Sequence, residues 1–161
     1  MTTISERTPE IGVPMGEELE KVTVLAVTDQ DETLRELRAL FAHTRWQLAA
    51  ATRCEDAVER LKTGRYPVVV CEQKLDDGCW RNILAALPAG ANPPKLLVTS
   101  SKADERLWTE VLTAGVYDLL PRPFDRSEVI RIIGLAWRDW GHQRAMRAAA
   151  GAPTSDTGLR S

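Results

Sequence analysis

The sequence contains no apolar run that approaches the roughly 18 residues needed for a membrane-spanning helix. Its first dozen residues also lack the apolar segment of a secretory signal. Cysteine is scarce: Cys54, Cys71 and Cys79 are odd in number and lack the spacing of a metal site. Free thiols are typical of a reducing compartment, so we expect a cytoplasmic protein that does not contact a membrane.

Motifs that carry chemistry are missing as well. The chain has no glycine-rich phosphate loop, no nucleophile elbow and no cluster of metal-ligating residues, so we expect neither an enzyme nor a bound cofactor. With 21 Lys and Arg against 23 Asp and Glu, its formal charge of −2 argues against a polybasic nucleic-acid binder. A length of 161 residues fits one domain and leaves too little chain for a separate DNA-binding output domain.

Charge is distributed unevenly along the chain. Residues 1–20 carry five acidic side chains and one basic one, and residues 138–161 carry four basic and two acidic ones. The polar first segment cannot bury enough apolar area to offset its ordering entropy. We therefore interpret 1–20 as a mobile acidic leader, 21–140 as the folded domain, and 141–161 as a helical extension with a mobile tail. Weak binding of nucleic acid by the basic end stays open as an alternative.

Within the folded domain, short β-branched segments alternate with segments whose apolar residues recur every three or four positions. The expected strands cover residues 22–27, 47–51, 68–71, 96–99 and 116–120. Capping boxes formed by Thr52 with Glu55 and by Asp125 with Glu128 predict the starts of two helices. The alternation predicts an α/β fold in which a parallel sheet lies between two layers of helices.

Four polar side chains follow the expected strands at the positions where such folds keep their functional sites. They are Asp29, Glu72, Thr99 and Arg122. The carboxyl ends of parallel strands meet at one edge of the sheet, so we expect these residues to converge on one small surface. Two carboxylates, a hydroxyl and a guanidinium form a chemically suggestive set, although each residue alone could simply cap a strand or a helix.

At these positions the chain resembles the receiver domains of bacterial response regulators, over roughly residues 22–138. The similarity rests on the segments 24–29, 68–72, 97–100 and 114–124. The last of these, from Ala114-Gly115 to Arg122-Pro123-Phe124, is the most specific. The resemblance implies a flavodoxin-like fold of five βα units, with the sheet order 2-1-3-4-5, and a role in phosphorelay signal transduction.

The departures from the family pattern bear on chemistry. Glu72 stands where the family has its phosphoacceptor aspartate, and Thr28 next to Asp29 stands where the family has an acidic pair for Mg²⁺. A hydroxyl is a poorer Mg²⁺ ligand than a carboxylate, so we expect Asp29 and Glu72 to bind the metal weakly or not at all. Phosphoryl transfer depends on positioning, and the extra methylene of Glu72 shifts the carboxylate.

Arg122 stands where the family has a lysine that bonds the phosphoryl group. A guanidinium can bind a carboxylate through two parallel hydrogen bonds, so we hypothesise that Glu72 and Arg122 together imitate the phosphorylated state. Two alternatives stay open. The site is merely structural, or the phosphoryl group is accepted by Asp76 or Asp77 instead. Carboxylates beside a glycine are, however, more often turn formers than nucleophiles. A cofactor-binding protein with the flavodoxin fold is a further alternative, which the acidic loop after the first strand disfavours.

The resemblance implies that Thr99 and Leu119 occupy the switch positions, with the Thr99 hydroxyl bonding either the modified side chain or the backbone. Such receivers use a face made of their helix 4, strand 5 and helix 5 to bind a partner or a second copy. The last helix, expected over roughly 126–149, contributes Trp137 and Trp140 to this surface. We expect Trp137 to close the core and Trp140 to project beyond it. Cys79, His43 and His142 receive no functional role.

Overall fold

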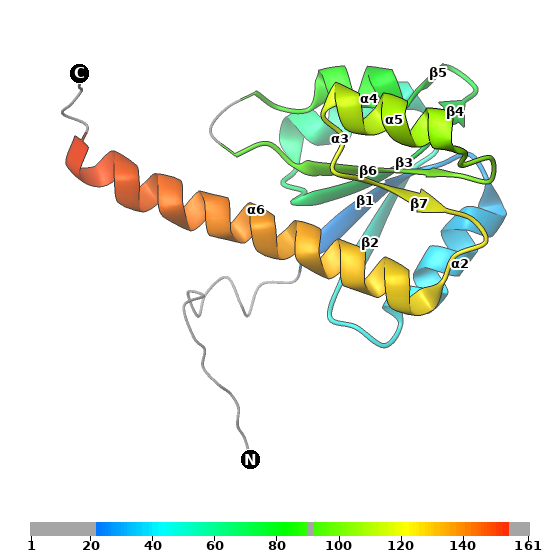
Figure 1. Ribbon diagram of the computed structural model, residues 1–161, viewed down its shortest axis with the longest axis horizontal. Coiled ribbons are helices and arrows are strands. Elements are labelled where there is room, and N and C mark those ends of the chain that lie inside the picture. The colour runs from blue at the N-terminus through cyan, green and yellow to red at the C-terminus, as the bar shows by residue number, and fades with distance from the viewer. Residues whose placement is uncertain (1–21, 90–91, 155–161) are drawn as a thin grey trace, which may run out of the picture.

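The structure, a computed structural model, describes residues 22–89 and 92–154 (Figure 1). The predicted acidic leader, 1–20, lies outside the described residues, as does the end of the predicted tail, 155–161. The described residues contain the whole of the predicted sheet.

A five-stranded parallel sheet forms the centre of the fold. From one edge to the other its strands are β2 (Gln47–Ala51), β1 (Thr23–Val27), β3 (Val68–Glu72), β6 (Lys95–Ser100) and β7 (Asp118–Pro121). Counted along the chain this is the order 2-1-3-4-5, which confirms the prediction. Every residue of the central strand β3 is buried, as expected for a continuous apolar run covered on both faces.

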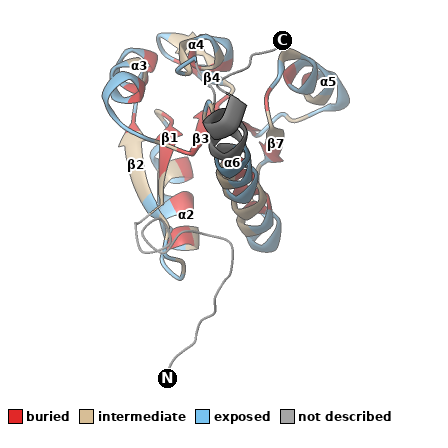
Figure 2. Cartoon of the chain, turned by 90° about the vertical axis from the view of Figure 1, so that its left-hand side faces the viewer, coloured by how far each residue is buried: buried red, intermediate tan, exposed pale blue. Residues whose placement is uncertain are grey.

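Helices cover both faces of the sheet, so the predicted three layers are present (Figures 1 and 2). One face carries α2 (Asp31–Phe41) and α6 (Arg126–Thr154), and the other carries α3 (Cys54–Thr63), α4 (Trp80–Ala86) and α5 (Glu105–Ala114). Successive residues of a strand point to opposite faces. In β1, Val24 and Ala26 accordingly belong to the core beneath α2 and α6, whereas Leu25 and Val27 belong to the core beneath the other three helices.

The start of α3 differs from the prediction. The helix begins at Cys54, and Thr52 does not cap it. A short hairpin, made of β4 (Lys74–Leu75) and β5 (Gly78–Cys79), instead brings in Asp77. Its Oδ1 accepts a hydrogen bond from the Cys54 amide at 2.8 Å, and its Oδ2 accepts one from the Glu55 amide at 3.1 Å. The predicted capping box does not form because the Asp77 carboxylate, from a distant segment, accepts the hydrogen bonds of these first amides. The Thr52 hydroxyl was expected to accept from an amide of this turn instead.

The start of α6 agrees with the prediction in part. The Asp125 carboxylate accepts a hydrogen bond from the Glu128 amide at 3.0 Å, as an N-cap does. The Glu128 side chain, however, does not return to the cap but accepts from Arg131 Nη2 at 2.6 Å. The helix is 29 residues long, which is longer than the predicted range of roughly 126–149. Its second half extends past the sheet (Figure 1).

Of the two tryptophan predictions in α6, the one for Trp137 agrees with the structure and the one for Trp140 is wrong. Trp140 is buried, at 8% exposure, while Trp137 is half-buried against the core beneath α2 and α6. The Arg65 guanidinium lies 5.3 Å from the Trp140 ring centroid, and the Asn92 side-chain amide donates to the Trp140 carbonyl at 3.0 Å. Trp140 therefore does not project from the domain, because the segment that leads into β6 lies against this part of the helix.

Two further bonds hold the same part of α6. The Tyr117 hydroxyl donates to Asp139 Oδ2 at 2.5 Å, and Lys95 Nζ donates to Gln143 Oε1 at 2.9 Å. Burial, followed by the hydrogen bond to Asp139, raises the pKa of Tyr117 to about 12. The bonds between α6 and the residues at the start of β6 and β7 thus continue to Gln143, about one turn past the buried Trp140.

Candidate functional site

The carboxyl edge of the sheet brings the predicted residues together. Glu72 is the last residue of β3 and pairs in register with Thr99 of β6. Arg122 follows β7, and Thr28 follows β1, the neighbour of β3 on the other side. The predicted convergence is correct because these strands are adjacent and parallel.

The Glu72 carboxylate is buried and held from two sides. It is 4% exposed, and Arg122 Nη1 lies 2.7 Å from its Oε1 and 2.6 Å from its Oε2. The Thr28 hydroxyl donates a further hydrogen bond to Oε2 at 2.7 Å. A carboxylate at this depth is tolerable only when its charge is paired and its oxygens accept hydrogen bonds, and both conditions are met here.

The geometry of the ion pair differs from the predicted one. A single nitrogen, Nη1 of Arg122, reaches both oxygens of Glu72, so the two parallel bonds expected of a guanidinium are not formed. The same nitrogen also donates to the Thr33 hydroxyl at 2.8 Å. The peptide bond between Arg122 and Pro123 is cis.

Thr33 is a site residue that the sequence analysis missed. It lies in the first turn of α2 and is buried, at 3% exposure. A signal for it exists in the sequence, because Thr33 precedes Leu37 and Phe41 at four-residue intervals and so shares the buried face of the helix. A hydroxyl on that face needs a hydrogen-bonding partner, and Arg122 supplies it.

Asp29, the other predicted carboxylate, is half-buried at the same edge and bonds within the loops. Its Oδ2 accepts from the Asp76 amide at 3.2 Å, and its Oδ1 accepts from the Gln30 side chain at 3.1 Å. No group of three or more His, Cys, Asp or Glu within residues 22–89 and 92–154 is arranged to hold a metal ion.

The donor set at this edge does not fit Mg²⁺. That ion requires several anionic or strongly polar oxygens in octahedral arrangement. Both oxygens of Glu72 already bind the Arg122 guanidinium, and Thr28 supplies a hydroxyl in place of a carboxylate. The positive charge beside Glu72 is therefore provided by arginine, and of the two predicted metal ligands, Asp29 and Glu72, only Asp29 is not bound to that arginine.

The side chains at the predicted switch positions face the interior. Thr99 is 1% exposed, and its hydroxyl donates to the Leu120 carbonyl at 2.9 Å, which is the backbone bond that the sequence analysis left open as the alternative. Leu119 is fully buried in the core beneath α3, α4 and α5.

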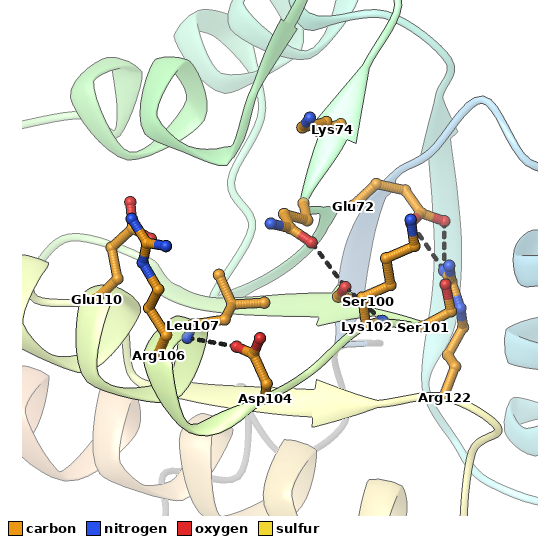
Figure 3. A pocket seen from close by; sticks show the side chains of 11 residues that line it. Glu72, Lys74, Ser100, Ser101, Lys102, Asp104, Arg106, Leu107, Glu110 and Arg122 are labelled. Carbon is orange, nitrogen blue, oxygen red and sulfur yellow. Dashed lines mark hydrogen bonds and ion pairs between the residues drawn. The ribbon is translucent and has the colours of Figure 1, made fainter.

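A cleft of about 470 Å³ opens beside the ion pair (Figure 3). It is lined by Glu72, Gln73, Lys74, Ser100, Ser101, Lys102, Asp104, Arg106, Leu107, Glu110 and Arg122. The Ser100 hydroxyl donates to Gln73 Oε1 at 2.7 Å, which joins the ends of β3 and β6 at the floor. Ten of its eleven lining residues are polar or charged, and Leu107 is the single apolar one.

Two of the three cysteines, Cys54 and Cys71, have thiols with a raised pKa. Burial, followed by the nearby Asp77 charge, raises the pKa of Cys54 to about 11, and burial raises the pKa of Cys71 well above its usual value. Both side chains stay protonated at neutral pH, whereas a thiolate is the reactive form. Cys79 is half-buried.

Comparisons with known proteins agree with the fold. The profile of the family described as the response regulator receiver domain matches residues 24–134. The signal receiver domain of an HD domain-containing protein from Pseudomonas fluorescens Pf-5 is 19% identical, with a TM-score of 0.67 over 78% of this chain and 99% of its own. The receiver of a putative Luxo repressor protein from Vibrio parahaemolyticus is 14% identical, with a TM-score of 0.68 over 79% and 98%.

A third structure, the beryllofluoride-activated NtrC4 receiver domain dimer, is 20% identical, with a TM-score of 0.65 over 73% of this chain and 98% of its own. No curated protein matches the chain significantly. Among the helices that the structure describes, none has the length and apolar character to cross a membrane.

Proposed function

Because this chain belongs to the family of response regulator receiver domains, we propose that it is an atypical receiver of two-component signalling that acts without being phosphorylated. The observation that carries the proposal is the buried ion pair between Glu72 and Arg122. Glu72 occupies the position of the phosphoacceptor aspartate, and Arg122 occupies that of the lysine that bonds the phosphoryl group. The pair supplies permanently the kind of charged contact that phosphorylation creates.

The hydrogen bonds around Glu72 also support the proposal, because they make its carboxylate a poor nucleophile. A nucleophilic carboxylate must present a free oxygen in line with the phosphoryl donor, and misplacement by 1 Å can cost about 100-fold in rate. Both Glu72 oxygens accept hydrogen bonds, from Arg122 and Thr28. Phosphoryl transfer to Glu72 would have to break these bonds without a metal site of ordinary strength beside it.

Phosphorylation of Asp76 or Asp77 in the hairpin, the alternative to a receiver that is not phosphorylated, is less well supported. Both oxygens of Asp77 accept backbone hydrogen bonds from the first turn of α3, so this carboxylate acts as a cap. Asp76 is exposed, and its amide donates to Asp29. Neither residue lies in the buried pair that gives this site its charge pattern.

We propose further that the receiver acts through contact with a signalling protein or with a second copy of itself, using the face formed by α5, β7 and α6. The related NtrC4 receiver is described as a dimer. On this face Leu112 of α5 is 46% exposed, which is unusual for a large apolar side chain in this structure. Trp137 is half-buried on α6 and stays a candidate contact, whereas the buried Trp140 does not.

Labelling with a small phosphoryl donor tests the central proposal. The protein is incubated with Mg²⁺ and acetyl phosphate, and intact mass spectrometry reports any added phosphoryl group. We expect no labelling of the native chain, and Mg²⁺-dependent labelling of the double variant Thr28→Asp, Glu72→Asp, which restores both missing aspartates. Acid-labile phosphate on the native chain that is lost in Asp29→Ala would contradict the proposal.

Hydrogen exchange separates a phosphomimic from a merely structural site. If the Glu72–Arg122 pair sets the conformation of the signalling face, Glu72→Gln changes amide exchange in α5 and β7 by more than the accompanying change in global stability accounts for. Exchange that changes only as much as global stability does would favour a structural site without a signalling role.

A further inference from the structure

The cleft beside the ion pair contains more positive charge than its own carboxylates neutralise. Four cationic and three anionic side chains line it, which leaves a net charge of +1. The cations are Lys74, Lys102, Arg106 and Arg122, and the anions are Glu72, Asp104 and Glu110. This local excess contrasts with the formal charge of −2 of the whole chain.

Each of the three carboxylates has an intramolecular partner. Glu72 binds Arg122, and the Asp104 carboxylate accepts from the Leu107 amide at 2.9 Å as the cap of α5. Glu110 accepts from Arg81 Nη2 at 2.6 Å. The negative charge of the cleft is therefore already used for structure.

Three of the cations are not used in this way. Lys74, Lys102 and Arg106 are exposed, and none of them forms an ion pair with a carboxylate of the described residues. They come from three separate segments: the hairpin, the loop between β6 and α5, and the first turn of α5. The Lys102 side chain extends toward Glu72, while Lys74 and Arg106 stand at other sides of the opening (Figure 3).

The remaining lining indicates what such a cleft can recognise. Leu107 is its single apolar residue and no aromatic side chain lines it, so a nucleobase would find no ring to stack on. The exposed Ser101 adds a hydroxyl, whereas the Ser100 hydroxyl already donates to Gln73 and accepts from the Lys102 amide. Cations spread around an opening fit a ligand with several separated negative charges better than a single compact anion.

We propose that this cleft binds an acidic polypeptide segment of the signalling partner, with Lys74, Lys102 and Arg106 receiving its carboxylates. The inference rests on the proposed function in that it names the chemistry of the partner. The contact is weak and salt-dependent, because an exposed ion pair contributes little and is screened within about 8 Å at physiological ionic strength.

Fluorescence anisotropy with a dye-labelled oligoglutamate peptide tests the proposal on the full-length chain. We expect saturable binding at low ionic strength, and a loss of about two- to fivefold in affinity for each of Lys74→Ala, Lys102→Ala and Arg106→Ala. Lys62→Ala is the matched control, since it removes one exposed cation from α3, outside the cleft. An equal loss in this control, or no binding at all, would overturn the proposal.

Binding of other ligands in the same assay identifies the chemistry that the cleft recognises. An oligoglutamine peptide should not bind. Pyrophosphate that binds at the same lysines while oligoglutamate does not would assign the cleft to phosphate and refute the proposal. A peptide of residues 1–21 that binds far more tightly than oligoglutamate, together with tighter oligoglutamate binding after deletion of 1–20, would assign the cleft to this chain's own acidic segment instead.

Glu72→Gln separates this inference from the proposed function. The variant removes one negative charge from the lining, so we expect the oligoglutamate peptide to bind more tightly, by about two- to fivefold. Weaker binding would count against the cleft. Phosphoryl labelling of the native chain would refute the phosphorylation-independent receiver without altering the peptide result, since the three cations lie outside the ion pair.

Discussion

Arg122 neutralises Glu72 through one nitrogen, Nη1, which lies within 2.7 Å of both carboxylate oxygens and also binds Thr33. The side chains are 18% and 5% exposed, so the pair is shielded from water. Three elements of the fold, β3, the end of β7 and the start of α2, are joined at this nitrogen. The contact that carries the proposed function therefore also holds these three elements together.

Removal of Arg122 should strongly destabilise the domain. Arg122→Ala leaves the buried Glu72 charge unpaired, and we expect a loss of about 3 kcal/mol in the free energy of unfolding, measured by urea denaturation. Arg131→Ala breaks an exposed pair with Glu128 and should cost less than about 1 kcal/mol. Equal losses in the two variants would show that the Glu72 pair is energetically ordinary.

Asp77 should make stability depend on pH in the acid range. Hydrogen bonds from the amides of Cys54 and Glu55 lower the pKa of its carboxyl below the usual 3.8. A lowered pKa stabilises the fold above pH 3.8, and that contribution is lost as the pH falls through the folded-state value. Asp77→Asn should lower the urea midpoint at neutral pH, and its difference from the native protein should shrink in acid. Asp76→Asn is the control, and its midpoint should change little.

Tyr117 should affect stability at the opposite end of the pH scale. Its pKa is raised from 10.0 to about 12, so folding favours the protonated phenol. That stabilisation is complete below pH 10 and is lost as the pH rises toward 12. Ultraviolet titration should show one tyrosine ionising late, and Tyr117→Phe should abolish this late step while Tyr66→Phe leaves it in place.

The tryptophans of α6 should rank opposite to the sequence-based expectation. Trp140→Ala removes a buried ring and should cost about 3 kcal/mol of unfolding free energy. Trp137→Ala, at a half-buried site, should cost less. Both losses can be measured by urea denaturation followed by circular dichroism, and a larger loss for Trp137 would refute the observed packing.

The five strands and the polar residues at their ends were predictable, because periodicity and strand ends are local signals. The sheet order, which brings Glu72, Thr99 and Arg122 together, came only from the resemblance to receiver domains. The α3 cap was not predictable in this way. Asp77 lies 23 positions after Cys54 in the chain, and nothing near Thr52 indicates that a distant carboxylate will bind the helix amides.

The details of the ion pair escaped prediction for a related reason. Residue types predicted that Glu72 and Arg122 meet, but the choice of a single nitrogen depends on Thr33, which lies 89 positions before Arg122 in the chain. The burial of Trp140 likewise depends on Arg65 and Asn92, which belong to loops whose course periodicity does not determine.

The bonds from Tyr117 and Lys95 to α6 have a mechanical consequence. They clamp the helix at Asp139 and Gln143 to the beginning of β6 and to the residue before β7, while its backbone continues to Thr154. At 1.5 Å per residue the whole helix is roughly 43 Å long, so it behaves as a lever whose fulcrum is this clamp. The arm beyond Gln143 is about 17 Å long, so a tilt of a few degrees at the clamp displaces the far end of the helix by only about 1 Å, and the direction of the projecting helix is set by these two bonds.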